Sequence, residues 1–279
     1  MTTADALSPA DLSPAALAFD AIADGFDSRF GEWLSVTAQR RAVRAALAEA
    51  FPPGSSLLEI GGGTGEDALW LLKRGRRVLL TDASPAMVRI AADKLGGQAG
   101  AETAVAAAEA LETLADQRAH DGAPRLDGAY SNFAALNCVD DLAPFARGLA
   151  RLLRPGAPAL LVVFGTASPG DVLVEALRRR PSAMFRRLQR GAAPARLGGR
   201  TFAVRYHRGR DLARALAPWF RPAGAQGIGV FVPPSGAEPW ISRHPQLLGA
   251  LEGLDRRFAG PLAVFGDHVL YRFIRTDAP

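Results

Sequence analysis

The sequence predicts an α/β protein with a mostly parallel sheet that helices cover on both faces. Between residues 56 and 164, short and almost continuously apolar runs alternate with segments of helical spacing, the pattern of strands buried on both faces. A glycine-rich loop follows the first apolar run directly, at the place where open α/β sheets bind ligands. Of the 279 residues, 48% are hydrophobic and 22% are charged, so a packed core is expected.

The first half of the chain contains the elements of this alternation in order. Residues 1–14 are small and polar and are expected to form a flexible arm, and helical spacing begins near Pro14. A helix is predicted over 36–51, because apolar residues recur along one side and Pro52-Pro53-Gly54 ends it. Strands are then predicted at 56–60, 77–82, 103–107, 127–133 and 159–164, and helices at 66–74, 85–95 and 140–153.

The second half departs from this alternation after Gly165. An arginine-rich segment over 168–200 is predicted to be helical, and Pro233-Pro234 opens a second insert over 233–262. Around these inserts we predict strands at 201–206, 227–232 and 267–274, and a helix at 211–216.

Positive charge is concentrated in one stretch of the chain. The formal net charge is +5. Residues 1–170 carry 15 basic and 20 acidic side chains, whereas 171–221 carry 13 arginines against three acids, and 222–279 are balanced. A basic protein is a candidate for nucleic-acid binding, but here the charge belongs to one segment of an otherwise acidic or neutral chain, which weakens that interpretation.

Several classes of protein are disfavoured by composition. The single cysteine, Cys138, excludes an internal disulfide framework and a cysteine-based metal site, and we expect no metal. No apolar run approaches the roughly 20 residues that a membrane-spanning helix needs. The N-terminus lacks a basic region followed by an apolar segment, so we predict no signal peptide and expect a cytoplasmic protein.

The glycine loop and an acid beyond it indicate a nucleoside-like cofactor. The loop reads L-L-E-I-G-G-G-T-G over 57–65, and a dinucleotide loop that starts at Gly61 and Gly63 would require its third glycine where Glu66 stands. An acid facing a pyrophosphate disfavours NAD and FAD. Asp82 ends the second predicted strand, where its carboxylate can accept hydrogen bonds from both hydroxyls of a ribose.

Four motifs in this order resemble the class I S-adenosylmethionine-dependent methyltransferases. They are E-I-G-G-G-T-G at 59–65, L-L-T-D-A-S-P-A-M at 79–87, L-D-G-A-Y-S-N-F at 126–133 and L-L-R-P-G at 152–156. The chain looks most similar to the small-molecule branch that includes the ubiquinone and menaquinone methylases. The resemblance covers roughly residues 15–165.

The resemblance implies a Rossmann-like fold and S-adenosyl-L-methionine as cofactor. The sheet would have seven strands, the last of them antiparallel. We expect one methyltransferase domain over 15–279, with a cofactor-binding core at 15–165 and helical lid inserts at 168–200 and 233–262 over the acceptor site.

The resemblance also implies roles for individual residues. Glu59 would anchor the loop, Asp82 would hold the ribose, and Phe19 would belong to an opening helix that folds over the cofactor. Ala107 stands where the family has an aspartate for the adenine amino group, which leaves that contact to the Ala108 backbone or to Glu109. The remaining implied cofactor residues are Gly61, Gly63, Thr64 and Gly65 at the methionine portion, Ala83 and Met87 at the adenine, and Ser131 and Asn132 beside the sulfonium.

The acceptor is less constrained by the sequence. A hydroxyl acceptor usually needs a general base, and His268 and His207 are the candidates, although each is also compatible with a structural role. The inserts mix aromatic and apolar residues with arginines, which suits an apolar or aromatic small molecule, with or without an anionic group; a solvated basic face is the alternative. O-methylation is slightly favoured over C- or N-methylation, in secondary, cofactor or lipid metabolism.

Other functions remain as alternatives. Amino-group DNA methylases carry an Asn/Asp-Pro-Pro-aromatic motif after the fourth strand, and here Ser131-Asn132-Phe133 has no prolines. Nucleic acid is therefore an unlikely partner, but methylation of RNA through the basic segment stays open. A second alternative is a cofactor-binding scaffold protein without turnover, and a dehydrogenase is the third.

Overall fold

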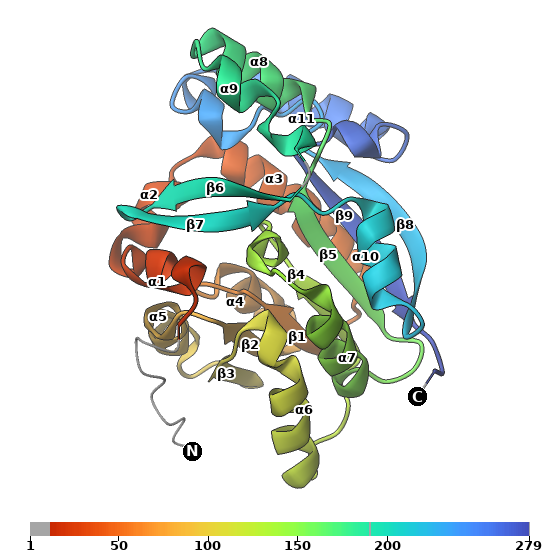
Figure 1. The fold of residues 1–279 in the computed structure, drawn as a ribbon. Helices are drawn as coiled ribbons and strands as arrows, with labels where there is room; N and C mark the ends of the chain where they lie inside the picture. The colour runs from red at the N-terminus through yellow and green to blue at the C-terminus, as the bar shows by residue number, and fades with distance from the viewer. Residues whose placement is uncertain (1–11, 190, 279) are drawn as a thin grey trace.

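A seven-stranded sheet runs through the computed structural model, which describes residues 12–189 and 191–278 (Figure 1). Its strand order is β3-β2-β1-β4-β5-β9-β8. Strands β1 to β5 run parallel, and β9 is antiparallel to both of its neighbours, β5 and β8, as predicted for the last strand. The bounds are β1 Ser56–Ile60, β2 Arg77–Asp82, β3 Ala101–Val105, β4 Gly128–Ser131, β5 Pro158–Phe164, β8 Phe220–Ile228 and β9 His268–Arg275.

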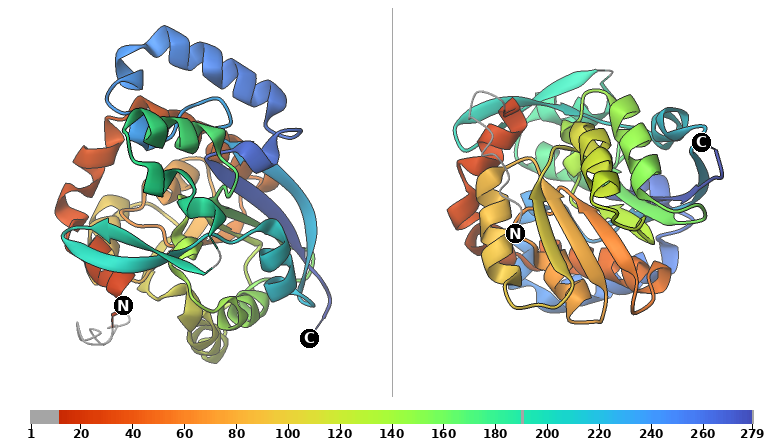
Figure 2. Two further views of the ribbon diagram at one scale, coloured as in Figure 1. Left: turned by 45° about the horizontal axis from the view of Figure 1, so that its top comes forward. Right: turned by 90° about the horizontal axis from the view of Figure 1, so that it is seen from below.

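Helices cover both faces of this sheet, as Figure 2 shows. Neighbouring strand residues such as Leu57 and Leu58 are both fully buried, and they belong to cores on opposite sides. One core includes residues of α6 Leu111–His120, α7 Leu142–Leu152 and α10 Gly209–Leu216. The other includes residues of α3 Leu34–Ala50, α4 Glu66–Leu72 and α5 Pro85–Leu95.

The first half follows the sequence prediction closely: every helix and strand predicted between residues 36 and 164 is present, with bounds within two residues of the prediction. Strand β3 begins two residues earlier than predicted, at Ala101. Helix α6 was not predicted; it buries only Leu111, Leu114 and Ala115, so its apolar periodicity is weak. Ser13 is not part of an arm, because its hydroxyl accepts from the Ala16 N–H and caps α1 Pro14–Asp20. Residues 1–11 of the expected arm lie outside the described residues.

The second half differs more from the prediction. The segment 168–200 is not helical throughout: α8 Pro169–Leu177 and α9 Pro181–Met184 are followed by a β-hairpin. Its strands, β6 Ala192–Leu197 and β7 Arg200–Arg205, are joined by Gly198-Gly199, where both φ angles are positive, as tight hairpin turns require. Strand β8 spans Phe220–Ile228 instead of 227–232, and the second insert contains α11 Pro245–Phe258.

The hairpin lies beside α1, far from its neighbours in sequence (Figure 1). Ala15 and Ala18 of α1 pack against Phe202 and Val204 of β7. The rings of Phe19 and Phe202 lie 6.0 Å apart, centroid to centroid. Two segments about 180 residues apart therefore form one apolar cover at the carboxyl ends of the central strands.

Candidate cofactor and acceptor site

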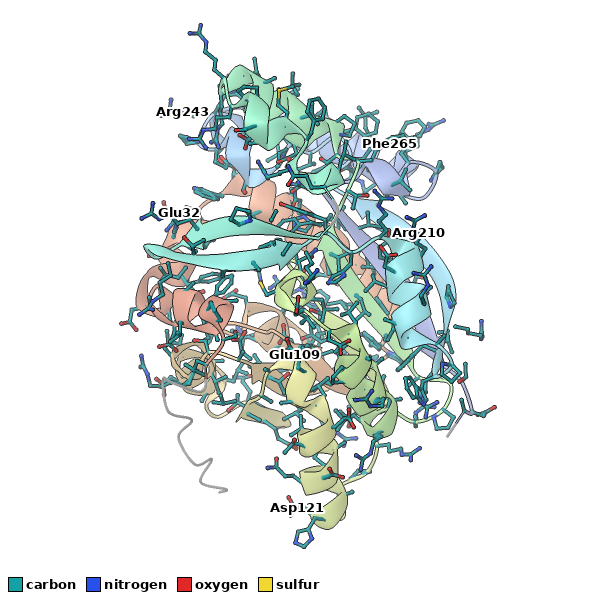
Figure 3. The ribbon with its side chains drawn as sticks, viewed as in Figure 1. Glu32, Glu109, Asp121, Arg210, Arg243 and Phe265 are labelled. Atoms are coloured by element: carbon teal, nitrogen blue, oxygen red, sulfur yellow. The ribbon has the colours of Figure 1, made fainter. Side chains whose placement is uncertain are left out.

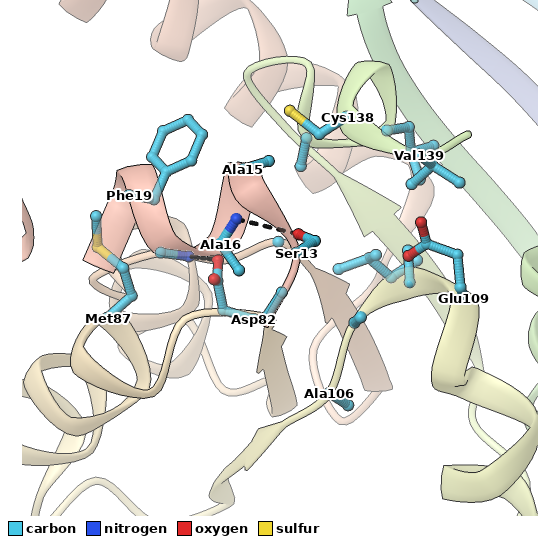
Figure 4. A pocket seen from close by; sticks show the side chains of 18 of the residues that line it. Ser13, Ala15, Ala16, Phe19, Asp82, Met87, Ala106, Glu109, Cys138 and Val139 are labelled. Atoms are coloured by element: carbon cyan, nitrogen blue, oxygen red, sulfur yellow. Dashed lines mark hydrogen bonds between the residues drawn. The ribbon is translucent and has the colours of Figure 1, made fainter. Parts of the chain in front are cut away.

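A cavity of about 520 Å³ opens at the carboxyl ends of the parallel strands (Figure 4). The loops after β1 to β4 form its walls, and α1 closes it from above. Many residues implied by the family resemblance line this cavity, namely Phe19, Gly61, Gly63, Asp82, Ala83, Met87, Ala108, Glu109 and Asn132. Four do not, namely Glu59, Thr64, Gly65 and Ser131. The sequence therefore located the cavity, although some of the residues support its walls instead of lining them.

Glycines of the loop after β1 satisfy two different requirements. Gly61 and Gly63 both have positive φ angles, +66° and +54°. A Cβ atom on Gly61 would lie 2.3 Å from the Cβ of Ala135, so this glycine permits close packing of the loops after β1 and β4. A Cβ atom on Gly63 would meet no atom within 4 Å, and Gly63 lines the cavity. Gly63 therefore leaves space in which a ligand can approach the backbone.

Asp82 presents an anchored carboxylate to the cavity. One oxygen accepts from the Gly63 N–H at 2.9 Å, and the other accepts from the Ser84 N–H at 2.9 Å. Burial raises the pKa of Asp82, and these backbone hydrogen bonds counteract that rise by favouring the ionised form. Because each carboxylate oxygen can accept more than one hydrogen bond, the group remains able to bind the two hydroxyls of a ribose.

Glu59 lies beneath the loop instead of in the cavity. Its side chain is buried, and the Oε2 atom has no hydrogen-bond partner among the described residues. Burial, followed by the nearby charge of Asp67, raises the pKa of Glu59 well above its usual range. A Cβ atom on Gly62 would lie 2.8 Å from the Glu59 carboxyl carbon, so Glu59 is placed to support the loop from below.

The N-terminal helices are fastened to the rim of the cavity by acids. Asp20 of α1 accepts from the Ser84 hydroxyl at 2.7 Å and from the Ala86 N–H at 2.9 Å. Asp27, in α2 Phe26–Gly31, forms an ion pair with Lys94 at 2.6 Å and accepts from the Thr64 hydroxyl. The opening helices thus fold over the cavity, as the resemblance implied, and Thr64 contributes by holding them.

Polar side chains that the sequence analysis did not single out hold the end of β4. Asn132 donates to Asp67 at 2.7 Å, and Asp67 is buried between Arg44 at 2.7 Å and Arg40 at 3.2 Å. The Arg40 guanidinium also lies 4.8 Å from the ring centre of Phe133. The signal for this cluster was present: two arginines four residues apart on one helix, and an acid in the first turn of another.

The backbone after β4 is strained where it borders the cavity. Phe133 and Ala134 have φ angles of +47° and +62°, a region that residues with a side chain seldom adopt. Such strain is concentrated at functional sites, where surrounding contacts maintain it. Here the hydrogen bond from Asn132 to Asp67 and the contact of Arg40 with the Phe133 ring maintain the strained backbone. The cavity wall beside Phe133 is therefore held in one conformation.

His268, one of the two predicted bases, does not line the cavity but contacts the ring of Phe133, which does. Its imidazole stacks on Phe164 at 4.9 Å between ring centres and meets the cavity residue Phe133 edge-on at 6.1 Å. The Nδ1 atom lies 3.3 Å from a carboxylate oxygen of Asp267. Although burial alone would raise the pKa of Asp267, the charges of His268 and Arg187 hold it well below its usual range. Asp267 is therefore an ionised partner for the imidazole.

His207, the other predicted base, also lies outside the lining of the cavity. Burial lowers its pKa, and backbone groups of Val139 and Leu136 partly oppose this shift. Both residues line the cavity on their other side, so the imidazole lies behind the wall. The Nε2 atom has no partner among the described residues. This placement favours a supporting role over proton transfer.

The arginines expected at the rim of an acceptor pocket are instead paired with acids. Arg187 is buried and forms ion pairs with Asp171 at 2.9 Å and Asp267 at 2.8 Å. Arg186 pairs with Asp171 at 2.8 Å and Glu175 at 3.2 Å. The expectation of free arginines facing an anionic acceptor is therefore wrong for these two residues, because local acids neutralise them.

Comparison with known proteins finds sequence similarity over part of the chain. Residues 58–159 match the family described as Methyltransferase domain. Over 139 residues the chain is 32% identical to the demethylmenaquinone methyltransferase of Thermobifida fusca, covering 49% of this chain and 53% of the relative. Over 143 residues it is 34% identical to the ubiquinone/menaquinone biosynthesis C-methyltransferase UbiE of Acidiphilium cryptum, covering 50% and 53%. The chain thus spans about half the length of the curated relatives it matches.

Solved structures extend the likeness in fold to the second half. The 1,6-didemethyltoxoflavin-N1-methyltransferase of Burkholderia thailandensis aligns over 99% of this chain and 94% of its own, with a TM-score of 0.54 and 20% identity. An S-adenosylmethionine-dependent methyltransferase of Mesorhizobium loti covers 85% and 98%, with a TM-score of 0.53 and 20% identity. The [4+2]-cyclase SpnF also aligns, covering 85% and 82%, with a TM-score of 0.53 and 17% identity, so the shared fold does not by itself define the reaction.

None of the helices in the described part of the chain is both long enough and apolar enough to cross a bilayer. Sequence match, strand order and cavity position agree with one another for the first half. The resemblance indicated by the four motifs is therefore confirmed: residues 58–159 match the methyltransferase-domain family, within a chain that has the class I methyltransferase fold.

Proposed function

We propose that the chain transfers a methyl group from S-adenosylmethionine to a small apolar or aromatic acceptor. The observation that supports this most directly is the anchored carboxylate of Asp82 beside the open space at Gly63, within one cavity. S-adenosylmethionine, when bound, supplies a methyl group on a positively charged sulfur. Asp82 would bind the ribose, Gly63 would lie along the methionine portion, and Met87 would pack against the adenine.

The adenine end has no aspartate of the usual kind. Ala107 lines the cavity there, and the nearby carboxylate belongs to Glu109, which is exposed and lies across the cavity from Asp82 (Figure 4). We assign the contact with the adenine amino group to Glu109 or to the Ala108 backbone. An exposed carboxylate competes with water, so this contact would add less affinity than the ribose contact at Asp82.

The acceptor side of the cavity is apolar and uncharged. Its wall after β4 includes Ala135, Leu136 and Val139, together with Cys138. Burial raises the pKa of the Cys138 thiol to about 11, so it stays neutral at physiological pH. An apolar or aromatic acceptor fits such a wall better than a charged polymer does, which supports a small molecule over RNA.

The names of the curated relatives bear on the atom that is methylated. The sequence analysis slightly favoured oxygen, whereas one relative is named a C-methyltransferase of ubiquinone/menaquinone biosynthesis and the other a demethylmenaquinone methyltransferase. We therefore propose a ring carbon of a reduced quinone or a related phenol as the acceptor atom, with oxygen as the alternative, in cofactor or lipid metabolism.

His268 is our candidate for the general base, with Asp267 as its partner. A hydrogen bond from Nδ1 to the Asp267 carboxylate would leave Nε2 of the neutral imidazole able to accept a proton. If Nε2 removes the hydroxyl proton of a phenol acceptor, the resulting phenolate is more nucleophilic at its oxygen and at the adjacent ring carbon. The ionised Asp267 would stabilise the protonated imidazole that results.

Calorimetry and turnover together test the proposed function. The full chain should bind S-adenosylhomocysteine with 1:1 stoichiometry, and methyl transfer should appear with at least one member of a panel of reduced quinones and simple phenols. Mass spectrometry detects the product, and NMR identifies the methylated atom. Stoichiometric binding without turnover on any acceptor would favour the scaffold, and methyl incorporation into RNA with a steep salt dependence would favour the RNA enzyme.

Replacement of His268 tests the base. His268→Gln should lower kcat by about 100-fold or more, since general-base catalysis typically contributes 10²–10⁴-fold, and should remove the acidic limb of the pH profile. Affinity for S-adenosylhomocysteine should not change. His207→Gln is the matched control and should retain the acidic limb. A normal pH profile for His268→Gln would rule out proton transfer by this residue.

A further inference from the structure

Helix α8 has its polarity reversed relative to an ordinary surface helix. Asp171 and Glu175, four residues apart, share one face, and both are buried. Leu173 and Leu177, also four residues apart, share the opposite face, where 61% and 76% of each residue is exposed to solvent. A helix of a globular protein normally buries its apolar stripe and exposes its acids.

Ion pairs explain why this orientation is stable. The acids of α8 contact Arg186 and Arg187, and Arg187 also binds Asp267 at the start of β9. Rotating α8 to bury its leucines would withdraw these acids and leave buried charges unpaired, which is costly. The ion pairs on the buried face of α8 therefore fix the orientation of the helix, and this orientation keeps the two leucines exposed to solvent.

The exposed apolar residues continue from α8 onto the segment that follows it. Phe185 and Leu188 are 56% and 51% exposed. A groove of about 500 Å³ lies between the two segments, and Leu173, Met184 and Phe185 are among the residues that line it. We call the set Leu173, Leu177, Phe185 and Leu188 the insert face. Single exposed leucines are ordinary on a protein surface, but a contiguous apolar patch marks an interaction site.

Positive charge borders the insert face. Arg178, Arg179 and Arg180 follow α8 directly, all three are exposed, and none forms an ion pair with a residue in the described part of the chain. The acids nearest in sequence, Asp171 and Glu175, are already paired inside. This end of the molecule also carries Arg243, opposite the end where Asp121 lies (Figure 3). The insert face is thus apolar at its centre with unneutralised arginines at its edge.

We propose that the insert face docks on an anionic lipid surface. Leucine and phenylalanine side chains would enter the boundary between headgroups and acyl chains, and Arg178 to Arg180 would contact the phosphates. The nine residues of α8 are too few to span a bilayer, so the helix would lie along the surface. A polyanion such as RNA would account for the exposed arginines but not for the exposed leucines. An apolar protein partner would account for the leucines but not for the arginines.

The proposal goes beyond methyl transfer and does not depend on it. It does place the membrane close to the acceptor side of the molecule, because Arg187 connects the buried face of α8 to Asp267, the partner of His268. Docking would therefore bring the candidate base near a source of apolar acceptors. Binding to vesicles requires neither cofactor nor turnover, so its result is independent of the proposed reaction.

Vesicle sedimentation with the full chain tests the proposal. The chain should bind vesicles of phosphatidylcholine mixed with phosphatidylglycerol and should bind phosphatidylcholine alone at least tenfold more weakly. The triple change Arg178→Gln, Arg179→Gln and Arg180→Gln should weaken binding by about 100-fold, since each arginine near an anionic surface contributes roughly five-fold. As a matched control, Arg210→Gln, Arg214→Gln and Arg221→Gln remove the same charge from the region of α10 and β8 and should reduce binding far less.

Apolar variants separate insertion from simple charge attraction. Leu173→Ser with Leu177→Ser should weaken binding at least tenfold, whereas Leu173→Met with Leu177→Met should preserve it. Circular dichroism and S-adenosylhomocysteine binding check that each variant is folded. Equal affinity for neutral and anionic vesicles, or no binding to either, would overturn the proposal. So would a lipid-free dimer in ultracentrifugation that the serine variant abolishes, because the insert face would then be covered by a second copy of the chain.

Discussion

The first half of the molecule and helix α8 in the second half relate polarity to burial in opposite ways. In residues 12–165 apolar strands are buried, and most acids lie at the surface or at the cavity rim. In residues 166–278 the helix α8 buries acids and exposes leucines, and Arg187 is buried among carboxylates. The first half therefore follows the usual pattern of apolar burial, apart from the ion-paired cluster at Asp67, whereas the orientation of α8 is set by ion pairs that form only after folding.

The comparison changes the meaning of the basic segment 171–221. Part of its charge is structural, because Arg186 and Arg187 neutralise acids inside the same segment. Arg205 pairs with Asp140 of the first half, so the segment also ties the two halves together. Arg178 to Arg180, at the edge of the insert face, are among the arginines of this segment that form no ion pair with a described residue. A single net charge conceals these different roles.

The largest effect is expected where the second half buries its charges. Arg187→Met would leave Asp171 and Asp267 without their shared partner, and breaking a buried pair in this way costs about 3–5 kcal/mol of unfolding free energy. Urea denaturation measures this loss. Arg210→Met is the control, because 65% of the Arg210 side chain is exposed and the change should cost no more than about 0.5 kcal/mol. Equal stability of the two variants would show that Arg187 is not a structural residue.

A change at Asp82 should affect binding in the first half more than folding. Asp82→Ala removes a carboxylate placed for two charge-assisted hydrogen bonds, so affinity for S-adenosylhomocysteine should fall by about 100-fold or more. Asp127→Asn is a suitable control, since Asp127 also accepts from a backbone N–H, that of Ser56 at 2.8 Å, and does not line the cavity. If calorimetry showed the same affinity for Asp82→Ala as for the native chain, the assignment of the ribose site would be wrong.

The smallest of these effects separates packing from binding within one loop. Gly61→Ala should destabilise the fold by roughly 1–3 kcal/mol, because its Cβ would lie 2.3 Å from Ala135. Gly63→Ala meets no atom, so its folding cost should be only the roughly 1–2 kcal/mol of a left-handed residue, while its methyl group would weaken cofactor binding about tenfold. Thermal melts and calorimetry on both variants provide the measurement. Loss of affinity in Gly61→Ala alone would reverse the two assignments.

Prediction from sequence succeeded where a pattern is local. Strands β1 and β2 have the predicted bounds, because apolar runs end at a glycine loop and at an acid. Helix α5 also does, because Ser84 caps it and Pro85 begins it. Helix α6 was missed since it buries few side chains. Strand β6 was missed because its alanines and arginines resemble a helix in composition, whereas its partner β7 was predicted to within one residue.

The sequence also identified a large part of the cavity but not its supports. Asp82, Gly61 and Gly63 belong to motifs with fixed spacing, so their positions could be anticipated. Asp67 and Arg40 were missed: two arginines four residues apart and an acid on another helix suggest a cluster, but only the tertiary structure pairs them.

By itself the sequence determined the parallel sheet and the position of the cavity, because glycines and acids at strand ends act through the backbone next to them. Tertiary structure alone decided which charges are buried, which histidine approaches the cavity, and which face of α8 meets solvent. The reason is physical: an ion pair between segments far apart in the chain has no local pattern, and its energy depends on burial that only the complete fold creates.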